Sequence, residues 1–125
     1  MPEVPYLLHA AEYPDGRGML RVLGTLPFNP VRMFDISDVP QGESRGGHAH
    51  RECWQVLYCA QGEVSIATTS LTPLDHEFDA AWHLQEGDAV VLPPLNCVDM
   101  TGFSSDCVLV VLASHPYNPS EVIAE

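Results

Sequence analysis

Lysine is absent from this 125-residue chain, so its only cations apart from histidine are five arginines. All five arginines lie within residues 1–51, whereas eleven of the 17 acidic residues lie within residues 52–125, and the formal net charge is −12. Binding to nucleic acid or to an anionic membrane requires clustered positive charge, so neither partner is expected. The arginines are Arg17, Arg21, Arg32, Arg45 and Arg51.

Long apolar runs and targeting signals are also missing. No run approaches the roughly 18 apolar residues of a membrane-spanning helix, and the N-terminus lacks a basic stretch followed by an apolar one. The four cysteines show no CxxC spacing, which argues against a zinc ribbon or a thioredoxin-like site. We therefore expect a cytoplasmic protein whose cysteines are small buried residues in a reducing compartment.

Helical periodicity is not found in any window of about 10 to 15 residues, whereas short apolar runs recur between Gly, Pro, Asp and Asn clusters. This pattern predicts an all-β fold, a sandwich or double-sheet jelly-roll β-barrel that forms one domain over residues 1–125. We also expect a tight hairpin at Gln61-Gly62 and a tail, residues 116–125, that packs on the outside. The predicted strands are Gly18–Leu23, Val31–Ile36, Trp54–Ala60, Glu63–Thr69, Asp88–Leu92 and Val108–Ala113.

One short segment of the chain contains several side chains that can act in catalysis or bind a metal, among them two histidines, His48 and His50. On a strand, residues i and i+2 point to the same side, so these two imidazoles project into one space. Arg45 precedes the pair by three residues. Histidine titrates near neutral pH and is also a common metal ligand, so the geometry fits either a proton-transfer pair or two metal ligands.

Two spaced patterns in the chain resemble the sequence motifs of the cupins, which are small double-sheet β-barrels. The first pattern has Gln55 where cupins usually have Glu, and the second has Val98 where they have His. Within the cupins, the chain is most similar to sugar-nucleotide 3,4-ketoisomerases over about residues 14–118. The cupin motifs are carried by Gly42, His48, His50, Gln55 and Gly62 and by Gly87 and Pro93, and the ketoisomerase likeness by Asp15–Gly18, Arg45–His50, Gln55–Leu57 and Phe103–Ser114.

The resemblance implies an isomerase that moves the carbonyl of a dTDP-4-keto-6-deoxyhexose from C4 to C3 through an enediol, without metal or cofactor. His50 would be the base and His48 the second proton carrier, because the reaction needs a base that titrates near neutral pH. Arg45 would polarise the sugar carbonyl or hold a phosphate, since the guanidinium fork matches such oxygens. Arg17 would grip the diphosphate or nucleotide, and Gln55 would hydrogen-bond within the barrel. The resemblance also implies a homodimer.

Three positions depart from the ketoisomerase pattern. Phe34 replaces a tyrosine, and phenylalanine cannot donate a hydrogen bond to a developing oxyanion. Cys97 and Val98 replace a Trp-His pair. These departures leave three alternatives: the substrate differs, Asp35 takes over part of the lost function, or activity is weakened or lost. Trp54 alternates with the histidines and is expected on the barrel-facing side, either as core or stacked on a base or sugar.

Two other functions remain open at the level of sequence. A metal-dependent cupin enzyme would use His48 and His50 as ligands, with Cys97 or Asp99 reaching in. Two imidazoles alone, however, leave a first-row metal under-coordinated. A non-catalytic cupin would hold the two histidines as a hydrogen-bonded pair and bind a sugar nucleotide or another small ligand.

Overall fold

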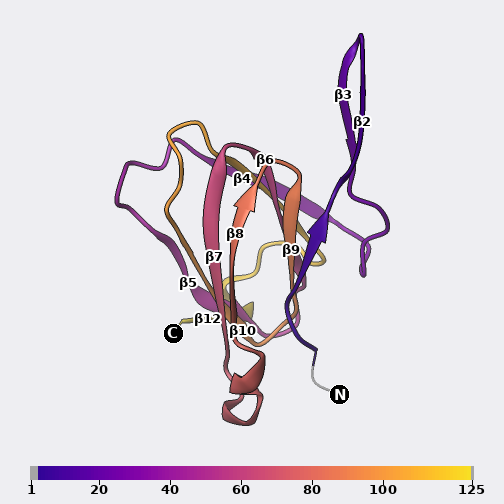
Figure 1. Ribbon diagram of the computed structural model, residues 1–125. Coiled ribbons are helices and arrows are strands. Elements are labelled where there is room, and N and C mark those ends of the chain that lie inside the picture. Colours follow the sequence, from indigo (N-terminus) through magenta and orange to yellow (C-terminus); the bar gives the residue numbers. More distant parts are fainter. Residues whose placement is uncertain (1–2, 125) are drawn as a thin grey trace.

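The computed structural model describes residues 3–124, without the side chain of Pro73, and its regular secondary structure is almost entirely β-strand (Figure 1). Two five-stranded antiparallel sheets enclose one core, so the expected all-β, double-sheet jelly-roll architecture is confirmed. In spatial order, the first sheet contains β1 (Tyr6–His9), β9 (Asp88–Leu92), β6 (Gln55–Gln61), β11 (Val108–Ala113) and β4 (Arg32–Ser37).

The second sheet has the C-terminal strand at one edge. In spatial order it contains β12 (Val122–Ala124), β5 (Arg45–His50), β10 (Asn96–Thr101), β7 (Glu63–Ser70) and β8 (Ala80–Gln85). The remaining elements are the hairpin strands β2 (Ala11–Asp15) and β3 (Gly18–Val22) and the 3₁₀ helices η1 (Pro73–Phe78) and η2 (Pro119–Glu121). Within residues 3–124, no helix has the length and apolarity needed to cross a membrane.

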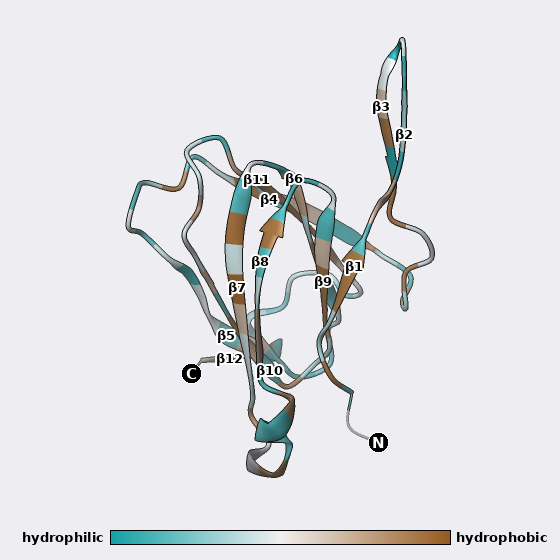
Figure 2. Cartoon of the chain, viewed as in Figure 1, coloured by the Kyte–Doolittle hydropathy of each residue, from teal (hydrophilic) through white to brown (hydrophobic). Residues whose placement is uncertain are grey.

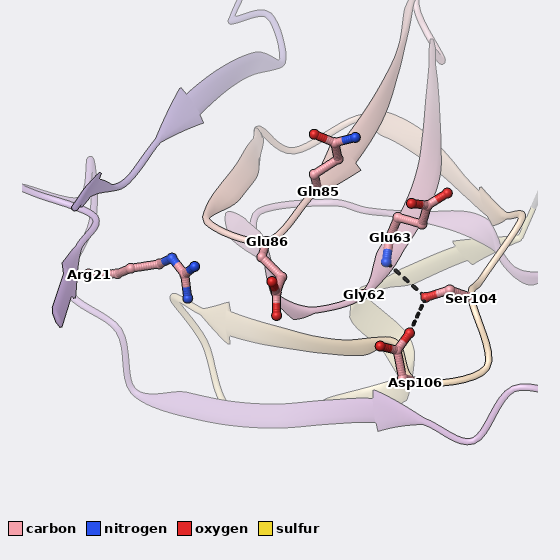
Figure 3. Close-up of a pocket in the computed structure, with 7 residues that line it drawn as sticks. All are labelled: Arg21, Gly62, Glu63, Gln85, Glu86, Ser104 and Asp106. Carbon is pink, nitrogen blue, oxygen red and sulfur yellow. Dashed lines mark hydrogen bonds between the residues drawn. The ribbon is translucent and has the colours of Figure 1, made fainter. Parts of the chain in front are cut away.

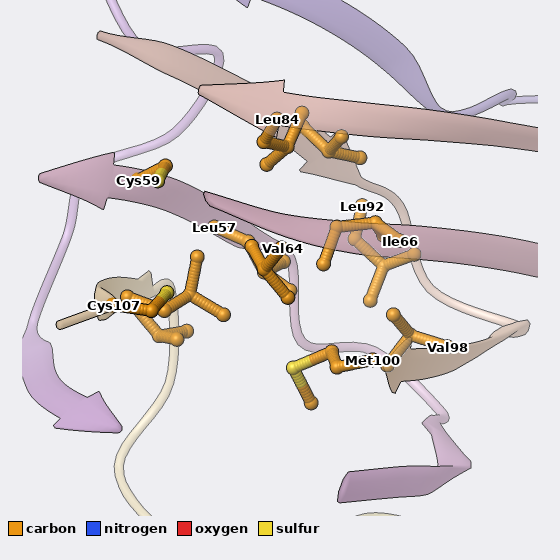
Figure 4. Close-up of a cluster of buried hydrophobic side chains, with 12 residues drawn as sticks. Leu57, Cys59, Val64, Ile66, Leu84, Leu92, Val98, Met100 and Cys107 are labelled. Atoms are coloured by element: carbon orange, nitrogen blue, oxygen red, sulfur yellow. The ribbon is translucent and has the colours of Figure 1, made fainter. Parts of the chain in front are cut away.

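The core lies between the two sheets (Figure 4). Strand β11 alternates half-buried and buried residues, and its buried residues Leu109, Val111 and Ala113 point inward. Strand β6 lies between β9 and β11 and is buried on both faces over most of its length. Burying each large aliphatic side chain contributes about 1.5–3 kcal/mol. The buried cluster consists of Leu57, Cys59, Val64, Ile66, Leu84, Val90, Leu92, Val98, Met100, Cys107, Leu109 and Val111.

The register of the first sheet determines which side chains of β4 and β6 enter the barrel. Ala113 of β11 pairs with Arg32 of β4 on one side and with Gln55 of β6 on the other. Val111 pairs in the same way with Phe34. Because directly opposite residues share a face and Ala113 and Val111 are buried in the core, Arg32, Phe34 and Gln55 point inward.

A β-bulge in β5 changes the direction of the side chains that precede the histidines. Val98 of β10 pairs with His48, but Met100 pairs with Arg45, so β5 has one extra residue between these pairs. Val98 and Met100 are core residues, so Arg45 lies on the same inward face as His48. Gly46 is required within this bulge because its φ is +106° and a Cβ there would collide with the carbonyl oxygen of Val98.

Two expectations about chain connections are wrong. Residues Gln61-Gly62 do not form a hairpin, because β6 belongs to the first sheet and β7 to the second. Gly62 instead turns the corner between the sheets with φ +74°, and Ser104 lies where its Cβ would be. The C-terminal segment does not simply pack outside: β12 pairs with β5 and completes the second sheet beside His50. Glu125 lies outside the described residues.

The hairpin of β2 and β3 projects away from the barrel (Figure 1). Its strands pair only with each other, and β3 carries several apolar residues (Figure 2). An isolated two-stranded hairpin is only marginally stable in water. Several apolar side chains of this hairpin are also exposed, so its apolar surface is not covered within one chain. The exposed apolar residues of the hairpin are Tyr13, Met19, Leu20 and Val22.

Candidate active site

A pocket of about 350 Å³ opens between the edge strand β4 of the first sheet and the strands β5 and β12 of the second. We call it the histidine pocket. It combines an apolar lining with a few polar side chains that converge from different strands, which is typical of small-molecule sites. The lining residues are Arg32, Met33, Phe34, His48, His50, Gln55, Tyr117 and Val122.

The strongest polar contact at the histidine pocket joins His50 to Glu121 of η2. Nδ1 of His50 lies 2.6 Å from Oε2 of Glu121. The other carboxylate oxygen, Oε1, accepts hydrogen bonds from the amide N–H of Glu52 at 2.5 Å and of Cys53 at 2.7 Å. Asn118 caps η2 by accepting a hydrogen bond from the amide of Ser120 at 3.1 Å. Glu121 is therefore held by three donors.

The ionisation of Glu121 determines the tautomer of His50. Burial raises the pKa of the Glu121 carboxyl, but the amide hydrogen bonds from Glu52 and Cys53 and the contact with His50 outweigh it, so the pKa lies below its ordinary value. A carboxylate only accepts hydrogen bonds, so Nδ1 of His50 must carry the proton. Nε2 of neutral His50 then has a free lone pair, and this buried atom has no hydrogen-bond partner within residues 3–124.

His48 lies beside His50 in an edge-to-face arrangement. The two ring centroids are 5.5 Å apart and the ring planes meet at 76°. His48 is half-buried and His50 is 7% exposed, so the pair extends from the rim of the histidine pocket to its floor. Two imidazoles at this separation are close enough to serve neighbouring atoms of one substrate.

The other predicted site residues are not all brought to the histidine pocket. Gln55 lines the pocket and is 5% exposed. Arg45 shares the inward face of β5 but lies at its exposed end, outside the lining. Arg17 lies at the turn of the projecting hairpin, where its side chain is 91% exposed and pairs with Asp15 at 2.9 Å.

Asp35 and Trp54 point away from the pocket, contrary to expectation. Asp35 alternates with Phe34 along β4, so it faces outward and cannot replace a hydroxyl inside. Trp54 packs on the outer face of the first sheet against a cluster around Val56. The segment between His50 and Trp54 is not a strand, so alternation cannot be counted across it.

Five pocket or site residues were not predicted as such from the sequence: Arg32, Met33, Tyr117, Glu121 and Val122. Arg32 could have been found, because it alternates with Phe34 on a strand that the sequence predicts. Tyr117 and Glu121 lie in the tail that was expected outside the barrel. Glu121 contacts a residue 71 positions away, and no local pattern indicates such a pairing.

The histidine pocket does not fit the ligand set of a metal-dependent cupin. Val98 is buried opposite His48, so an isopropyl group lies where the third imidazole would be, and Gln55 offers a neutral amide. The one group of three candidate ligands in the described chain is His50, Cys53 and Glu121, within 4.8 Å of one another. His48 is not part of that group, and the carboxylate of Glu121 already accepts a hydrogen bond from Nδ1 of His50.

A second hollow lies at the far end of β6 from the histidine pocket, beside Arg21 of the hairpin (Figure 3). It presents the carboxylates of Glu63, Glu86 and Asp106, while its single arginine, Arg21, donates to Glu12 at 2.8 Å. Such a surface repels a diphosphate. The histidine pocket is therefore the better candidate for an anionic ligand.

The lowered pKa of Glu121 predicts a loss of stability in acid. The carboxylate contributes its full stabilisation above the ordinary glutamate pKa of 4.5, and this contribution is lost as the pH falls through the lower folded-state value. We expect the difference in unfolding free energy between wild type and Glu121→Gln to stay constant from pH 7 to about 4.5 and to shrink as the pH is lowered further. Urea titrations at successive pH values measure it, and a difference independent of pH would contradict the assignment.

Comparison with known proteins agrees with this fold. The family model described as FdtA: WxcM-like, C-terminal matches residues 5–125. The TDP-4-oxo-6-deoxy-alpha-D-glucose-3,4-oxoisomerase of Aneurinibacillus thermoaerophilus is 34% identical over 116 residues, which cover 89% of this chain and 79% of that protein.

Solved structures give the same result over the whole fold. QdtA, a sugar 3,4-ketoisomerase from Thermoanaerobacterium thermosaccharolyticum in complex with TDP, superposes with a TM-score of 0.86 at 27% identity, covering 100% of this chain and 90% of that one. A 3,4-ketoisomerase from Helicobacter canadensis superposes with a TM-score of 0.85 at 29% identity, covering 97% of this chain and 90% of that one. The chain therefore belongs to the FdtA family of WxcM-like C-terminal domains.

Proposed function

We propose that this protein is a 3,4-ketoisomerase of a TDP-4-keto-6-deoxyhexose. The single observation that carries the proposal is the buried Nε2 of His50, a residue that lines the histidine pocket: this atom has no hydrogen-bond partner within residues 3–124, while Nδ1 is fixed by Glu121. The 34% identical relative is named as an oxoisomerase of such a sugar nucleotide. A related ketoisomerase has been crystallised with TDP-4-keto-6-deoxyglucose.

The residues of the pocket account for each proton that the reaction moves. Nε2 of His50 takes the proton from C3, and the electron pair of the broken C–H bond forms the C3=C4 double bond, leaving negative charge on O4. The proton of the C3 hydroxyl then passes to O4, which moves the negative charge to O3. His48 delivers a proton to C4 as the electron pair on O3 forms the new C=O bond. The carbonyl now lies at C3. Gln55 orients a sugar hydroxyl from the floor of the pocket.

The nucleotide part of the substrate extends from the pocket toward Arg45. Arg45 projects from the inward face of β5 at the exposed start of that strand, where its guanidinium can pair with a phosphate. Arg17 keeps its proposed role of gripping the diphosphate or nucleotide. Because its hairpin projects away from the body of its own chain, Arg17 acts on the substrate of a neighbouring subunit in this proposal.

The active form in this proposal is a cytoplasmic homodimer. The exposed apolar side chains of the hairpin support a second copy as the partner that covers them. Cys53, Cys59 and Cys107 are buried thiols outside any disulfide, which fits a reducing compartment.

Nuclear magnetic resonance of the purified protein with dTDP-4-keto-6-deoxyglucose in heavy water tests the proposed function. We expect loss of the C3 proton signal and growth of a 3-keto product that carries deuterium at C4. A protein-free sample corrects for spontaneous exchange. Absence of exchange with dTDP- and GDP-linked 4-keto sugars would remove the enzymatic proposal, and ligand-induced thermal stabilisation without exchange would indicate a binding protein instead.

A further inference from the structure

Arg32 is a cation on the inner face of the barrel that has no counter-charge. Its side chain points inward from β4 and lines the histidine pocket together with both histidines. Its Nε is buried and has no hydrogen-bond partner within the described residues, none of which forms an ion pair with it. A buried donor without a partner destabilises the folded protein, because it has lost its hydrogen bonds to water. Such a group in a pocket indicates a ligand that accepts from it.

Two aromatic rings hold the guanidinium in place. Its central carbon lies 5.2 Å from the centroid of the Phe34 ring and 5.7 Å from that of Tyr117. Cation–π contacts of this kind orient a guanidinium without using its N–H donors. The N–H groups of Arg32 thus stay available to a molecule in the pocket.

We infer that Arg32 is a catalytic residue that binds the two oxygens of the enediolate intermediate; this inference rests on the proposed function. When His50 takes the C3 proton, charge develops on O4, and after the C3 hydroxyl loses its proton the charge lies on O3. O3 and O4 are neighbouring, coplanar oxygens on a C=C bond. The planar fork of a guanidinium donates to both at once, as it does to a carboxylate.

This role favours the transition state over the bound substrate. In the 4-keto sugar only one of the two oxygens is planar and neither is charged, so the second hydrogen bond of Arg32 strengthens as the enediolate forms. Among the residues that line the histidine pocket, Arg32 is the sole permanent cation. Arg45, outside the lining, is left for the phosphates.

The test replaces Arg32 in the intact protein by alanine and by lysine. Removing a preorganised donor to an oxyanion lowers kcat by about 10²–10³-fold, and we expect this loss in Arg32→Ala with TDP affinity unchanged by calorimetry. Arg32→Lys keeps the charge but not the fork, so its kcat should lie between those of wild type and Arg32→Ala. Millimolar guanidinium chloride should restore part of the Arg32→Ala activity, and tetramethylammonium chloride should not.

Each alternative has a distinct result. A kcat within threefold of wild type in both variants overturns the inference while leaving the isomerase intact. An unchanged kcat with a raised KM and weakened TDP binding also overturns it and assigns Arg32 to the phosphates. An inactive wild type removes the proposed function and this inference together. Thermal unfolding checks that the variants fold, and if Arg32→Ala does not, the lysine variant alone decides between these results.

Discussion

Replacing His50 by asparagine should abolish the exchange of the C3 proton with heavy water. The variant loses the unpartnered Nε2 that the proposal assigns as the base, and general-base catalysis contributes about 10²–10⁴-fold to rate. Asparagine is the suitable replacement because its amide N–H can still donate toward Glu121, so the carboxylate does not become an isolated buried charge. The exchange rate by nuclear magnetic resonance gives the effect directly.

Two control variants separate the base from other histidines. His83→Asn removes an exposed histidine that lies 3.3 Å from Glu63, and it should leave exchange unchanged. His48→Asn should retain exchange at C3 but slow the appearance of product, because His48 delivers the proton to C4. If His50→Asn kept the exchange and His48→Asn lost it, the roles of the two histidines would be reversed.

The sequence predicts the barrel and the histidine pair because both rest on local alternation. Strands β6, β7, β9 and β11 lie within one residue of their predicted bounds, since apolar runs ended by Gly, Pro or Asp are a local signal. The same alternation correctly places His48 and His50 on one face. It fails for Trp54, because the segment between it and His50 leaves the strand conformation.

The parts that the sequence could not predict depend on long-range contacts. The pair Gln61-Gly62 resembles a hairpin turn in sequence. The strands that flank it, β6 and β7, nevertheless enter different sheets, because each pairs with strands that lie elsewhere in the chain. The bulge that turns Arg45 to the face of His48 requires the register with β10. Glu121 reaches His50 only because β12 pairs with β5.

Changing Glu121 to glutamine should inactivate the enzyme by inverting the tautomer of His50. The amide N–H groups of Glu52 and Cys53 both point at Oε1, so the carbonyl oxygen of the glutamine will occupy that place. Its NH₂ group then faces Nδ1 of His50, which must accept, and the imidazole proton moves to Nε2. The base in the pocket becomes a donor. Loss of the correct tautomer lowers kcat by about 10²–10⁴-fold.

The tautomer itself can be measured, which separates this effect from a general disturbance of the fold. The ¹⁵N chemical shifts of His50 should report protonated Nδ1 in the wild type and protonated Nε2 in Glu121→Gln, while TDP affinity stays unchanged. Glu63→Gln is the matched control, because Glu63 also faces a histidine, His83, but at the surface. It should keep full activity. A Glu121→Gln enzyme with kcat within threefold of wild type would show that His50 acts as a base without the carboxylate. Glu121 would then serve only to join η2 to the loop at Glu52 and Cys53.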